Sequence, residues 1–362
     1  MAYVKKGGSR MAAKALIAMS GGVDSSVTAA RMVEAGYTCL GATMRLHGYG
    51  ACGSADDARD AAAVAASLGM SHRVYDFSAA FSAEVIERFV TAYERGETPN
   101  PCIECNRHLK FAGLYQKALE EGCDVIATGH YARVAYDAVT GRYTLKKAKA
   151  LGKDQTYVLY FLTQEQLAHT CFPLGELDSK EQVRQIAERY GFGNARKRDS
   201  QDICFVPDGK YAEFIRQRTG REYPAGDFVD TEGRVLGQHN GIIGYTIGQR
   251  KGLGLALPAP LYVCRKCVED NTVVLAPETA LYSSRLLAER FNWVSGITPA
   301  APVRVTARTR YSAKEAPATV TPLPGDRAEV LFDEPQRAIT CGQAVVLYDG
   351  DEVVGGGTIV DT

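Results

Sequence analysis

The stretch SGGVDSS at residues 20–26 decides the fold of the N-terminal half of this 362-residue chain. The apolar run KALIAM at 14–19 leads into it, and a run with helical spacing at 23–35 follows and stops at Gly36. A strand, a glycine loop and a helix in this order turn backbone N–H groups and the positive helix end toward one point. The stretch therefore predicts a site for phosphate, although a tight turn capped by serine would also explain the glycines.

Asp24 distinguishes this loop from the common phosphate loop GxxxxGKS/T, whose lysine it lacks. A carboxylate beside phosphates is unfavourable unless a cation lies between them, so Asp24 indicates Mg²⁺ on a leaving pyrophosphate. The loop resembles that of ATP-pyrophosphatases, which cleave ATP between its α and β phosphates to adenylate a substrate oxygen. This resemblance implies that the adenine lies near Met44 and Gly129. It implies ATP contacts from Ala18, Met19, Ser20, Gly21, Gly22, Val23, Asp24, Ser25 and Ser26.

Strands and helices alternate beyond the loop. We expect strands at 37–46, 71–77 and 124–128, and helices at 55–68, 81–95, 107–121 and 179–190. Ser54 and Asp57 form a capping box at the start of the helix at 55–68. Such alternation predicts an α/β domain with a doubly wound parallel sheet, which binds its ligands at the carboxyl ends of its strands.

The pattern changes after residue 190. Residues 195–202 are polar and basic, glycine and proline become frequent, and from Leu261 onward short β-type runs follow one another. Regularly spaced short strands predict a small β-barrel. We expect four parts: a leader at 1–13, a nucleotide-binding catalytic domain at 14–208, a small central α+β or β domain at 209–275, and a C-terminal β-barrel at 276–362.

The composition excludes several classes of protein. Lys plus Arg and Asp plus Glu both number 42, so any contact with nucleic acid must come from a local patch. No apolar run is long enough to span a membrane, and the first eleven residues lack the apolar stretch of a secretion signal. We therefore expect a cytoplasmic protein without membrane association whose ten cysteines are reduced.

Three cysteines stand out by their context. In TPNPCIECN at 98–106, Cys102 and Cys105 directly precede the expected helix, whose dipole would lower a thiol pKa. Cys204 follows the basic run at 196–198, which suits thiolate stabilisation, RNA phosphates or simply a solvated surface. Cys264 and Cys267 could pair with the first two as a zinc site, but a structural role is favoured. The remaining cysteines have the context of ordinary small buried residues: Cys39, Cys52, Cys123, Cys171 and Cys341.

Six motifs taken together resemble the bacterial tRNA-specific 2-thiouridylase family. They are SGGVDSS (20–26), TPNPCIECN (98–106), ATGHY (127–131), KDQTY (153–157), DSQDICF (199–205) and HNGIIGYTIGQRKGLG (239–254). The resemblance implies an adenine nucleotide alpha hydrolase-like fold, ATP as co-substrate, tRNA as substrate and a sulfur-donor protein, either a cysteine desulfurase or a relay protein. It implies that Cys105 attacks during sulfur transfer and that Cys204 carries a persulfide. Matching positions imply tRNA or target-base contacts from Asn100, Pro101, Cys102, His130, Lys153, Asp154, Gln155, Arg310, Tyr311 and Gln343.

Cys102 departs from the members of the family that carry aspartate at this position as a general acid/base. Two alternatives stay open. Cys102 substitutes in acid/base chemistry or positioning, or Cys102, Cys105 and Cys204 ligate an iron–sulfur cluster with one open iron. Apart from Asp24 beside Mg²⁺ and these three cysteines, no metal ligand is predicted.

The chemistry implied by the resemblance is a two-stage reaction. The C2 oxygen of a flipped-out wobble uridine attacks the α-phosphate of ATP, and the persulfide of Cys204 then displaces AMP, with Cys105 resolving the product. An alternative is another ATP-pyrophosphatase that forms an amide or amidates a small molecule, which would not need the cysteines. Arg304, Arg308 and Arg310 share one face of an expected strand, as a phosphate stripe or as the wet face of a barrel.

Overall fold

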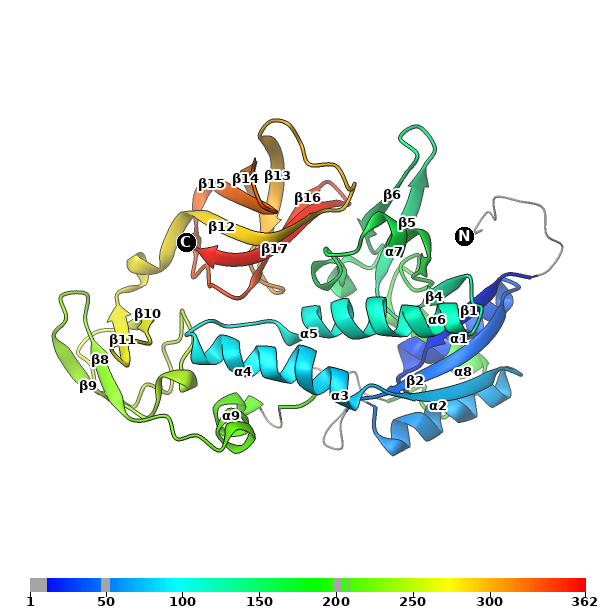
Figure 1. Cartoon of the computed structure of the whole chain (residues 1–362), viewed down its shortest axis with the longest axis horizontal. Helices are drawn as coiled ribbons and strands as arrows, with labels where there is room; N and C mark the ends of the chain where they lie inside the picture. Colours follow the sequence, from blue (N-terminus) through cyan, green and yellow to red (C-terminus); the bar gives the residue numbers. More distant parts are fainter. Residues whose placement is uncertain (1–11, 47–52, 198–202, 207–208) are drawn as a thin grey trace.

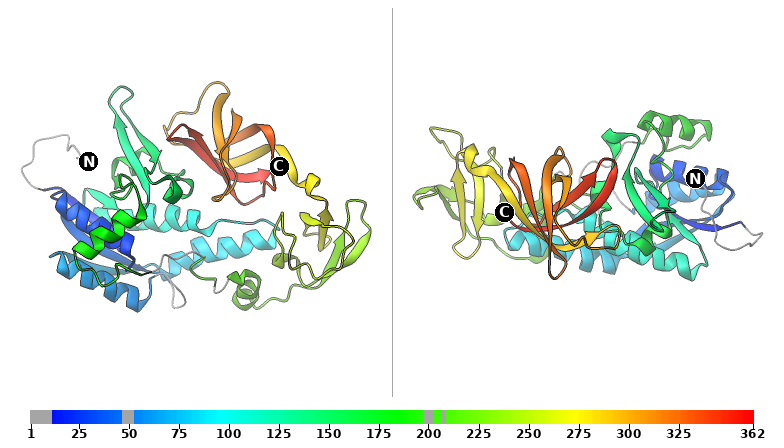
Figure 2. Two further views of the ribbon diagram at one scale, coloured as in Figure 1. Left: turned by 180° about the vertical axis from the view of Figure 1, so that it is seen from behind. Right: turned by 90° about the horizontal axis from the view of Figure 1, so that it is seen from above.

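A computed structural model describes residues 12–46, 53–197, 203–206 and 209–362. The N-terminal sheet and a small central domain lie at opposite ends of the molecule, and a β-barrel lies between them beside the helices α4 and α5 (Figure 1). The view from above in Figure 2 shows the same order along the molecule. Within the described ranges, no helix has the length and apolar character needed to cross a lipid bilayer.

The N-terminal domain is built on a parallel sheet in the order β3-β2-β1-β4-β7. Its strands are β1 (Lys14–Ala18), β2 (Thr38–Arg45), β3 (Ser71–Asp76), β4 (Val125–Ala127) and β7 (Thr170–Cys171). Buried residues of β1, including Ala15 and Ile17, pack against helices α1, α2 and α8 in one cluster, while Leu16 faces a second cluster with Leu114. The predicted doubly wound sheet is confirmed, because helices cover both of its faces.

The helices of this domain follow the predicted order. They are α1 (Val23–Glu34), α2 (Ala55–Ser67), α3 (Ser78–Phe81), α4 (Glu87–Glu94), α5 (Pro101–Glu104), α6 (Tyr115–Glu120), α7 (Gln164–Ala168) and α8 (Lys180–Arg189). The π-type segments η1 (Ser82–Ile86) and η2 (Cys105–Leu114) join α3 to α4 and α5 to α6, and the short 3-10 turns η3 (Leu151–Lys153) and η4 (Thr156–Val158) follow later. The capping box of α2 is present, with the Ser54 hydroxyl accepting from the Asp57 N–H.

The helix that carries the CxxC pair begins earlier than the sequence pattern predicts. It starts at Pro101 rather than at residue 107, because Asn100 caps it by accepting from the N–H of Cys102 at 3.1 Å. Proline at the first helical position needs no hydrogen-bond partner, which makes Pro101 a starting residue rather than a breaker. Cys102 and Cys105 therefore lie inside the first turns of the helix, and the π-type segment begins at Cys105.

The central domain is a sheet in the order β10-β11-β8-β9 with one helix. Its elements are β8 (Gly226–Val229), β9 (Val235–His239), β10 (Tyr262–Cys267), β11 (Thr272–Ala276), α9 (Tyr211–Thr219) and the 3-10 turn η6 (Ile242–Gly244). The runs at 262–263 and 272–275 belong to this sheet and lie within 209–275, the range expected for the central domain. They pair with each other, the second also pairs with β8, and their apolar residues pack with Phe228.

The C-terminal domain is an antiparallel barrel. Its strands are β12 (Tyr282–Trp293), β13 (Val303–Arg308), β14 (Ala316–Leu323), β15 (Arg327–Arg337), β16 (Ala344–Asp349) and β17 (Glu352–Asp361), preceded by the 3-10 turn η7 (Glu278–Leu281). Strand β12 pairs with both β15 and β17, so the sheet closes on itself, and the predicted barrel is confirmed.

A hairpin of the N-terminal domain extends the barrel sheet. It consists of β5 (Ala132–Asp137) and β6 (Arg142–Lys147), and β6 pairs with β17 at Lys146 and Glu352. The buried ammonium group of Lys147 lies 2.6 Å from a carboxylate oxygen of Glu315 and donates to the carbonyl of Gly350. The sequence pattern did not predict this hairpin, which joins the first domain to the last.

Candidate functional site

The phosphate loop depends on one backbone conformation. Gly21 has φ +71°, and a Cβ atom there would lie 2.5 Å from the carbonyl oxygen of Asp57 at the start of α2. Only glycine combines this conformation with so close an approach. Gly22 caps α1, whose first turn holds Asp24. The loop thus joins the carboxyl end of β1 to the amino end of α1, as predicted.

The loop serines are held by the loop itself. The hydroxyls of Ser25 and Ser26 donate to the carbonyl of Gly22 at 2.9 and 3.1 Å, and Ser25 accepts from the N–H of Ser20 at 3.2 Å. Ser25 and Ser26 are buried, whereas Ser20 is exposed. The hydroxyls are therefore already oriented in the absence of a ligand.

Asp24 is bound by two groups from distant parts of the chain. The ammonium group of Lys180 lies 2.8 Å from each of its carboxylate oxygens, and the hydroxyl of Tyr131 donates to Oδ1 at 2.8 Å. Gly129 lies against the same turn, since a Cβ there would meet the backbone of Asp24 at 3.1 Å. Neither Tyr131 nor Lys180 was predicted as a site residue, although Tyr131 ends the ATGHY motif, and no local motif marks Lys180.

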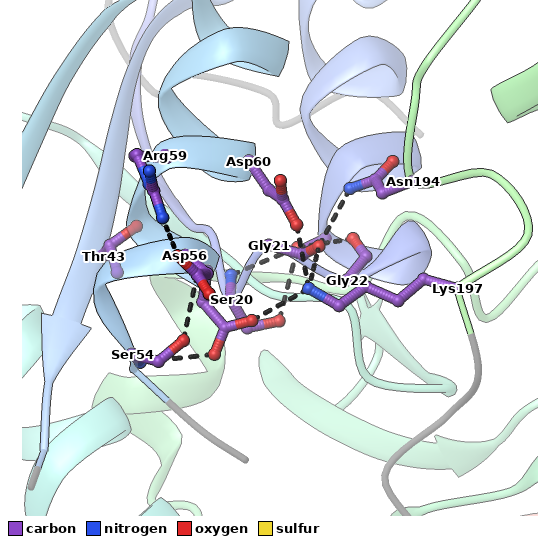
Figure 3. Close-up of polar contacts among 12 residues, drawn as sticks. Ser20, Gly21, Gly22, Thr43, Ser54, Asp56, Arg59, Asp60, Asn194 and Lys197 are labelled. Carbon is purple, nitrogen blue, oxygen red and sulfur yellow. Dashed lines mark hydrogen bonds and ion pairs between the residues drawn. The ribbon is translucent and has the colours of Figure 1, made fainter. Parts of the chain in front are cut away.

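The segment after α8 also contacts the phosphate loop, through Asn194 and Lys197. Asn194 donates to the carbonyl of Gly21 and to the hydroxyl of Ser26, both at 2.9 Å. Lys197 donates to the carboxylates of Asp57 and Asp60, also at 2.9 Å (Figure 3). Lys197 belongs to the basic run expected to meet a thiol or RNA. In the structure Lys197 links the loop to α2. Arg198, which ends the basic run, and residues 199–202, which begin the DSQDICF motif, lie outside the described residues.

The remaining predicted nucleotide residues lie on neighbouring strands. Met44 is near the carboxyl end of β2 and packs against the cluster that contains Leu16 and Leu114. The hydroxyl of its neighbour Thr43 donates to the carbonyl of Met19 at 2.8 Å. The carboxyl ends of β1, β2 and β4 therefore converge at one edge of the sheet, as expected for a doubly wound fold.

The two cysteines with predicted roles in sulfur transfer share one environment. Cys105 and Cys204, far apart in sequence, both pack against an apolar cluster that includes Phe81, Phe89 and Phe205. The Phe205 ring meets the rings of Phe81 and Phe89 edge-on, with centroids 5.7 and 5.2 Å away. This contact anchors the chain next to Cys204. Cys102 is exposed at the start of α5.

Metal ligands do not gather around these thiols. Across the ranges that the structure describes, no group of three or more His, Cys, Asp or Glu side chains is placed to hold a metal ion. Cys102, Cys105 and Cys204 therefore do not fit an iron–sulfur cluster in this arrangement. Cys264 lies in β10, where its thiol donates to the carbonyl of Val274 and burial raises its pKa, in keeping with the structural role expected for this pair.

A pocket of about 220 Å³ lies where the three domains meet. It is lined by Thr98, Thr246, Arg310, Tyr311, Ser312, Thr340 and Gln343. Arg310 donates to the carbonyl of Ala338 at 2.5 Å and to the hydroxyl of Thr340 at 2.8 Å, and burial lowers its pKa. Gln343 donates to the carbonyl of Thr98 at 2.7 Å, in the segment that leads to Cys102. We call this the junction pocket.

Three of the ten predicted tRNA residues line the junction pocket, namely Arg310, Tyr311 and Gln343. Tyr311 donates to the carbonyl of buried Asp154 at 3.3 Å, and burial raises the Tyr311 pKa, with Asp154 and Cys102 adding to the effect. Lys153 is exposed beside them. His130 instead lies in the core, only 8% exposed, and burial together with Lys110 lowers its pKa well below the ordinary value. Its ring is not presented at the surface in this arrangement.

Two of the three arginines in the predicted stripe on β13 are paired with carboxylates. Arg304 forms two hydrogen bonds with Asp333 at 2.7 and 2.8 Å, and Arg308 bonds Glu315 at 3.0 Å. Arg310 lies beyond the end of the strand, in the junction pocket. Of the three predicted phosphate contacts, Arg310 is the one whose described contacts are carbonyl and hydroxyl oxygens rather than a carboxylate.

A larger cavity of about 470 Å³ lies on the other side of α5, between α4 and the barrel. Its charged lining includes Glu84, Arg88, Glu104 and Arg290. Arg290, with φ +50° in a bulge of β12, reaches the Glu104 carboxylate at 3.3 Å. This contact ties the barrel to the helix that carries Cys105.

Models of known families match the chain in three consecutive parts. A tRNA methyl transferase HUP domain matches residues 13–208, a tRNA methyl transferase PRC-barrel domain matches 212–277, and an aminomethyltransferase β-barrel domain matches 283–359.

Curated relatives match nearly the whole chain. A protein named tRNA-specific 2-thiouridylase MnmA from Acetivibrio thermocellus is 50% identical over 355 residues, which cover 96% of this chain and 99% of that protein. Proteins of the same name from Moorella thermoacetica and Clostridioides difficile are 51% and 47% identical, each covering at least 95% of this chain and 98% of the relative. Among solved structures, a U34-tRNA thiolase NcsA from Methanococcus maripaludis, with a 4Fe-4S cluster, matches 57% of this chain and 65% of its own at 18% identity and a TM-score of 0.35.

Proposed function

Because this chain belongs to the family of tRNA-specific 2-thiouridylases, which are tRNA sulfurtransferases, we propose that it adenylates the C2 oxygen of a tRNA wobble uridine and then replaces that oxygen with sulfur from Cys204. One observation carries the proposal. Cys105 and Cys204 pack against the same apolar cluster although they lie far apart in the sequence. An enzyme that forms amides would need neither cysteine, so the amide-forming alternative gives no reason for placing both against one cluster.

The first stage uses the phosphate loop. The C2 oxygen of the uridine attacks the α-phosphate of ATP, a C2–O–P linkage forms, and pyrophosphate leaves. The N–H groups at the start of α1 and the oriented hydroxyls of Ser25 and Ser26 support binding of the phosphates. Met44 and Gly129, at the ends of β2 and β4, would border the adenine.

Asp24 suits Mg²⁺, an ion that proteins often bind through one carboxylate together with substrate phosphates. No larger ligand group is needed for such a site. Mg²⁺ bound there would supply positive charge against the leaving pyrophosphate. The same carboxylate accepts from Lys180 and Tyr131.

The second stage uses the thiols. The terminal sulfur of the Cys204 persulfide attacks C2, AMP leaves with the former C2 oxygen, and a C2–S–S–Cys204 linkage results. The Cys105 thiolate then attacks the Cys204 sulfur, which releases 2-thiouridine and leaves a disulfide between Cys105 and Cys204. A thiol reductant resets the pair and a sulfur-donor protein renews the persulfide. Cys102, exposed near Tyr311, would position the base or exchange a proton with it.

Substrate binding would involve the junction pocket. Asn100 and Pro101 lie at the start of α5, and Arg310, Tyr311 and Gln343 line the pocket beside the segment that leads to them. The Tyr311 hydroxyl donates to the carbonyl of Asp154, which lies between Lys153 and Gln155 in the chain. This arrangement supports a tRNA that contacts the catalytic domain and the barrel together.

The test is nucleoside mass spectrometry of an unmodified tRNA transcript incubated with the protein, ATP, Mg²⁺, a thiol reductant and a cysteine desulfurase with cysteine, which supplies the persulfide sulfur. We expect ATP-dependent 2-thiouridine from the wild type and from the control Cys264→Ser, whose half-buried thiol lies in the central sheet. Cys204→Ser should form none, yet still release pyrophosphate when tRNA is added. Thiouridine formed by Cys204→Ser, or a wild type that releases no pyrophosphate with tRNA, would contradict the proposal.

A further inference from the structure

Lys110 carries a positive charge that no side chain in the described part of the chain balances. The residue lies on η2, the segment that begins at Cys105, and it is half-buried. Among the described residues, neither a hydrogen bond nor an ion pair holds its ammonium group. A charge that is partly withdrawn from water without a partner is costly. A cation in this state indicates a ligand that supplies the missing negative charge.

The residue before Lys110 packs with the thiols. Leu109 is buried in the apolar cluster against which Cys105 and Cys204 pack. Because η2 begins at Cys105, Lys110 follows that cysteine by about one turn of the π-type segment. Lys110 is thus attached to the element that brings Cys105 to the Cys204 side of the molecule.

The residue after Lys110 packs at the nucleotide edge of the sheet. The centroid of the Phe111 ring lies 5.8 Å from that of the His130 ring. His130 follows Gly129, which lies against the backbone of Asp24 in the first turn of α1. The charge of Lys110 adds to the effect of burial in lowering the His130 pKa. Lys110 therefore lies between the thiols and the end of β4, where the nucleotide is expected.

Under the proposed function, the α-phosphate of ATP is the anionic group that belongs between these two places. In the first stage it becomes bonded to the C2 oxygen of the uridine. In the second stage it leaves with that oxygen, while sulfur from Cys204 bonds C2. The α-phosphate is therefore held between the phosphate loop and the thiols in both stages. A fixed cation beside it would stabilise the charge that develops there.

We propose that Lys110 is a further catalytic residue, whose ammonium group donates to a non-bridging oxygen of the α-phosphate in ATP and in the adenylated uridine. As the persulfide sulfur bonds C2 and the C2–O bond breaks, the electron pair of that bond goes to the oxygen that leaves with AMP. Lys110 offsets this charge and keeps its proton. The inference rests on the proposed function and adds to it a cation that the SGGVDSS loop lacks.

Two other cations of the same helical run have partners of their own. The guanidinium group of Arg107 lies 4.9 Å from the centroid of the Phe161 ring. The ammonium group of Lys117 lies 2.7 Å from a carboxylate oxygen of Glu120. Lys117→Met is therefore the matched control for Lys110→Met, because it removes a paired lysine from the same run.

The first experiment titrates AMP and adenosine into the full chain without tRNA and follows binding by calorimetry. The two ligands differ only in the α-phosphate. Lys110→Met should lower the affinity for AMP about tenfold, the effect of losing one charge-assisted bond, and leave the affinity for adenosine unchanged. Lys110→Arg keeps the charge and should retain part of the AMP affinity. Lys117→Met should bind both ligands like the wild type.

The second experiment measures chemistry, tRNA binding and stability in the same variants. At saturating tRNA, Lys110→Met should release pyrophosphate about a hundredfold more slowly in a single turnover. Its tRNA affinity in a filter-binding assay should equal that of the wild type. Its urea midpoint should be equal or higher, because the variant has lost an uncompensated charge, whereas loss of a structural lysine would lower the midpoint.

Three results would overturn the inference. The first is an AMP affinity that Lys110→Met leaves unchanged. The second is a loss of tRNA affinity with normal AMP binding, which would assign the cation to a phosphate of the RNA backbone. The third is a lowered urea midpoint with equal losses of AMP and adenosine affinity, which would make Lys110 structural. A wild type that binds neither AMP nor ATP with Mg²⁺ would instead contradict the proposed function.

Discussion

The phosphate loop and the junction pocket are two polar sites built in opposite ways. The loop is one contiguous motif, and its hydroxyls and carbonyls mostly bond one another. The junction pocket takes Thr98 from the first domain, Thr246 from the second and the rest of its lining from the barrel. A mutation in the loop should therefore act locally on ATP, whereas one in the pocket should act on domain packing and on tRNA.

The strongest test of this contrast is Gly21→Ala. The change forces a left-handed backbone on alanine and drives its Cβ into the carbonyl of Asp57, which together cost about 4 kcal/mol. ATP affinity, measured by calorimetry, should fall roughly a thousandfold. Gly36→Ala is the matched control, because Gly36 has φ +82° with no atom within 4 Å of the added Cβ. Equal losses of ATP affinity in both variants would show that close approach is irrelevant.

Lys266 should make the packing of the central domain on α4 depend on pH. Its ammonium group donates to the carbonyl of Tyr245 and lies over the Tyr93 ring, and burial lowers its pKa from 10.5 to about 8. Between these values the unfolded chain holds a proton that the folded chain has released, so stability rises with pH. The shift corresponds to on the order of 3 kcal/mol across the whole window.

The measurement for Lys266 is urea unfolding at several pH values from 7 to 11. The difference in unfolding free energy between the wild type and Lys266→Met should grow with pH above about 8 and stay flat below it. ATP affinity should show no matching change. If the difference in unfolding free energy does not change with pH, the Lys266 amine is solvated in the folded protein and the prediction is wrong.

Arg310→Met should weaken tRNA binding and spare ATP. The variant removes donors to the oxygens of Ala338 and Thr340, and a lost bond to a charged donor costs about 2 kcal/mol. We expect tRNA affinity in a filter-binding assay to fall about tenfold. Arg304→Met is the control, since Arg304 is exposed and paired with Asp333. If Arg304→Met weakens tRNA binding as much, the outer face of the barrel and not the pocket contacts RNA.

The smallest expected effect is a change in ATP affinity that should differ between two capping boxes. Ser54 caps α2 and Thr163 caps α7, each with the reciprocal side-chain bond. Replacing either by alanine should cost about 1 kcal/mol of unfolding free energy in urea. Only Ser54→Ala should also weaken ATP binding, by about twofold to threefold, because Asp57 of its box holds Lys197 against the loop. A matching loss of ATP affinity in Thr163→Ala would contradict this coupling.

The sequence predicted what contiguous residues determine. The strand, loop and helix around residues 20–26, the capping box of α2 and the closed barrel each leave a local pattern. The sequence did not predict Lys180, Asn194 or the hairpin β5–β6, since their partners are chosen by tertiary contacts. The start of α5 at Pro101 was missed for a different reason, because Asn100 followed by Pro101 is a helix start and the expected helix was placed only from residue 107.

The pairing of β6 with β17 can form only late in the synthesis of the chain. Leu145 and Lys147 leave the ribosome early, but their partners Tyr348, Glu315 and Gly350 are translated much later. At 5–20 residues per second, the roughly 200 residues between the two strands take about 10–40 s to make. During that time the nascent first domain exposes an unfinished apolar cluster and an unpaired strand edge. Ribosome-associated chaperones should therefore bind nascent chains that end between residues 150 and 345 more than longer ones.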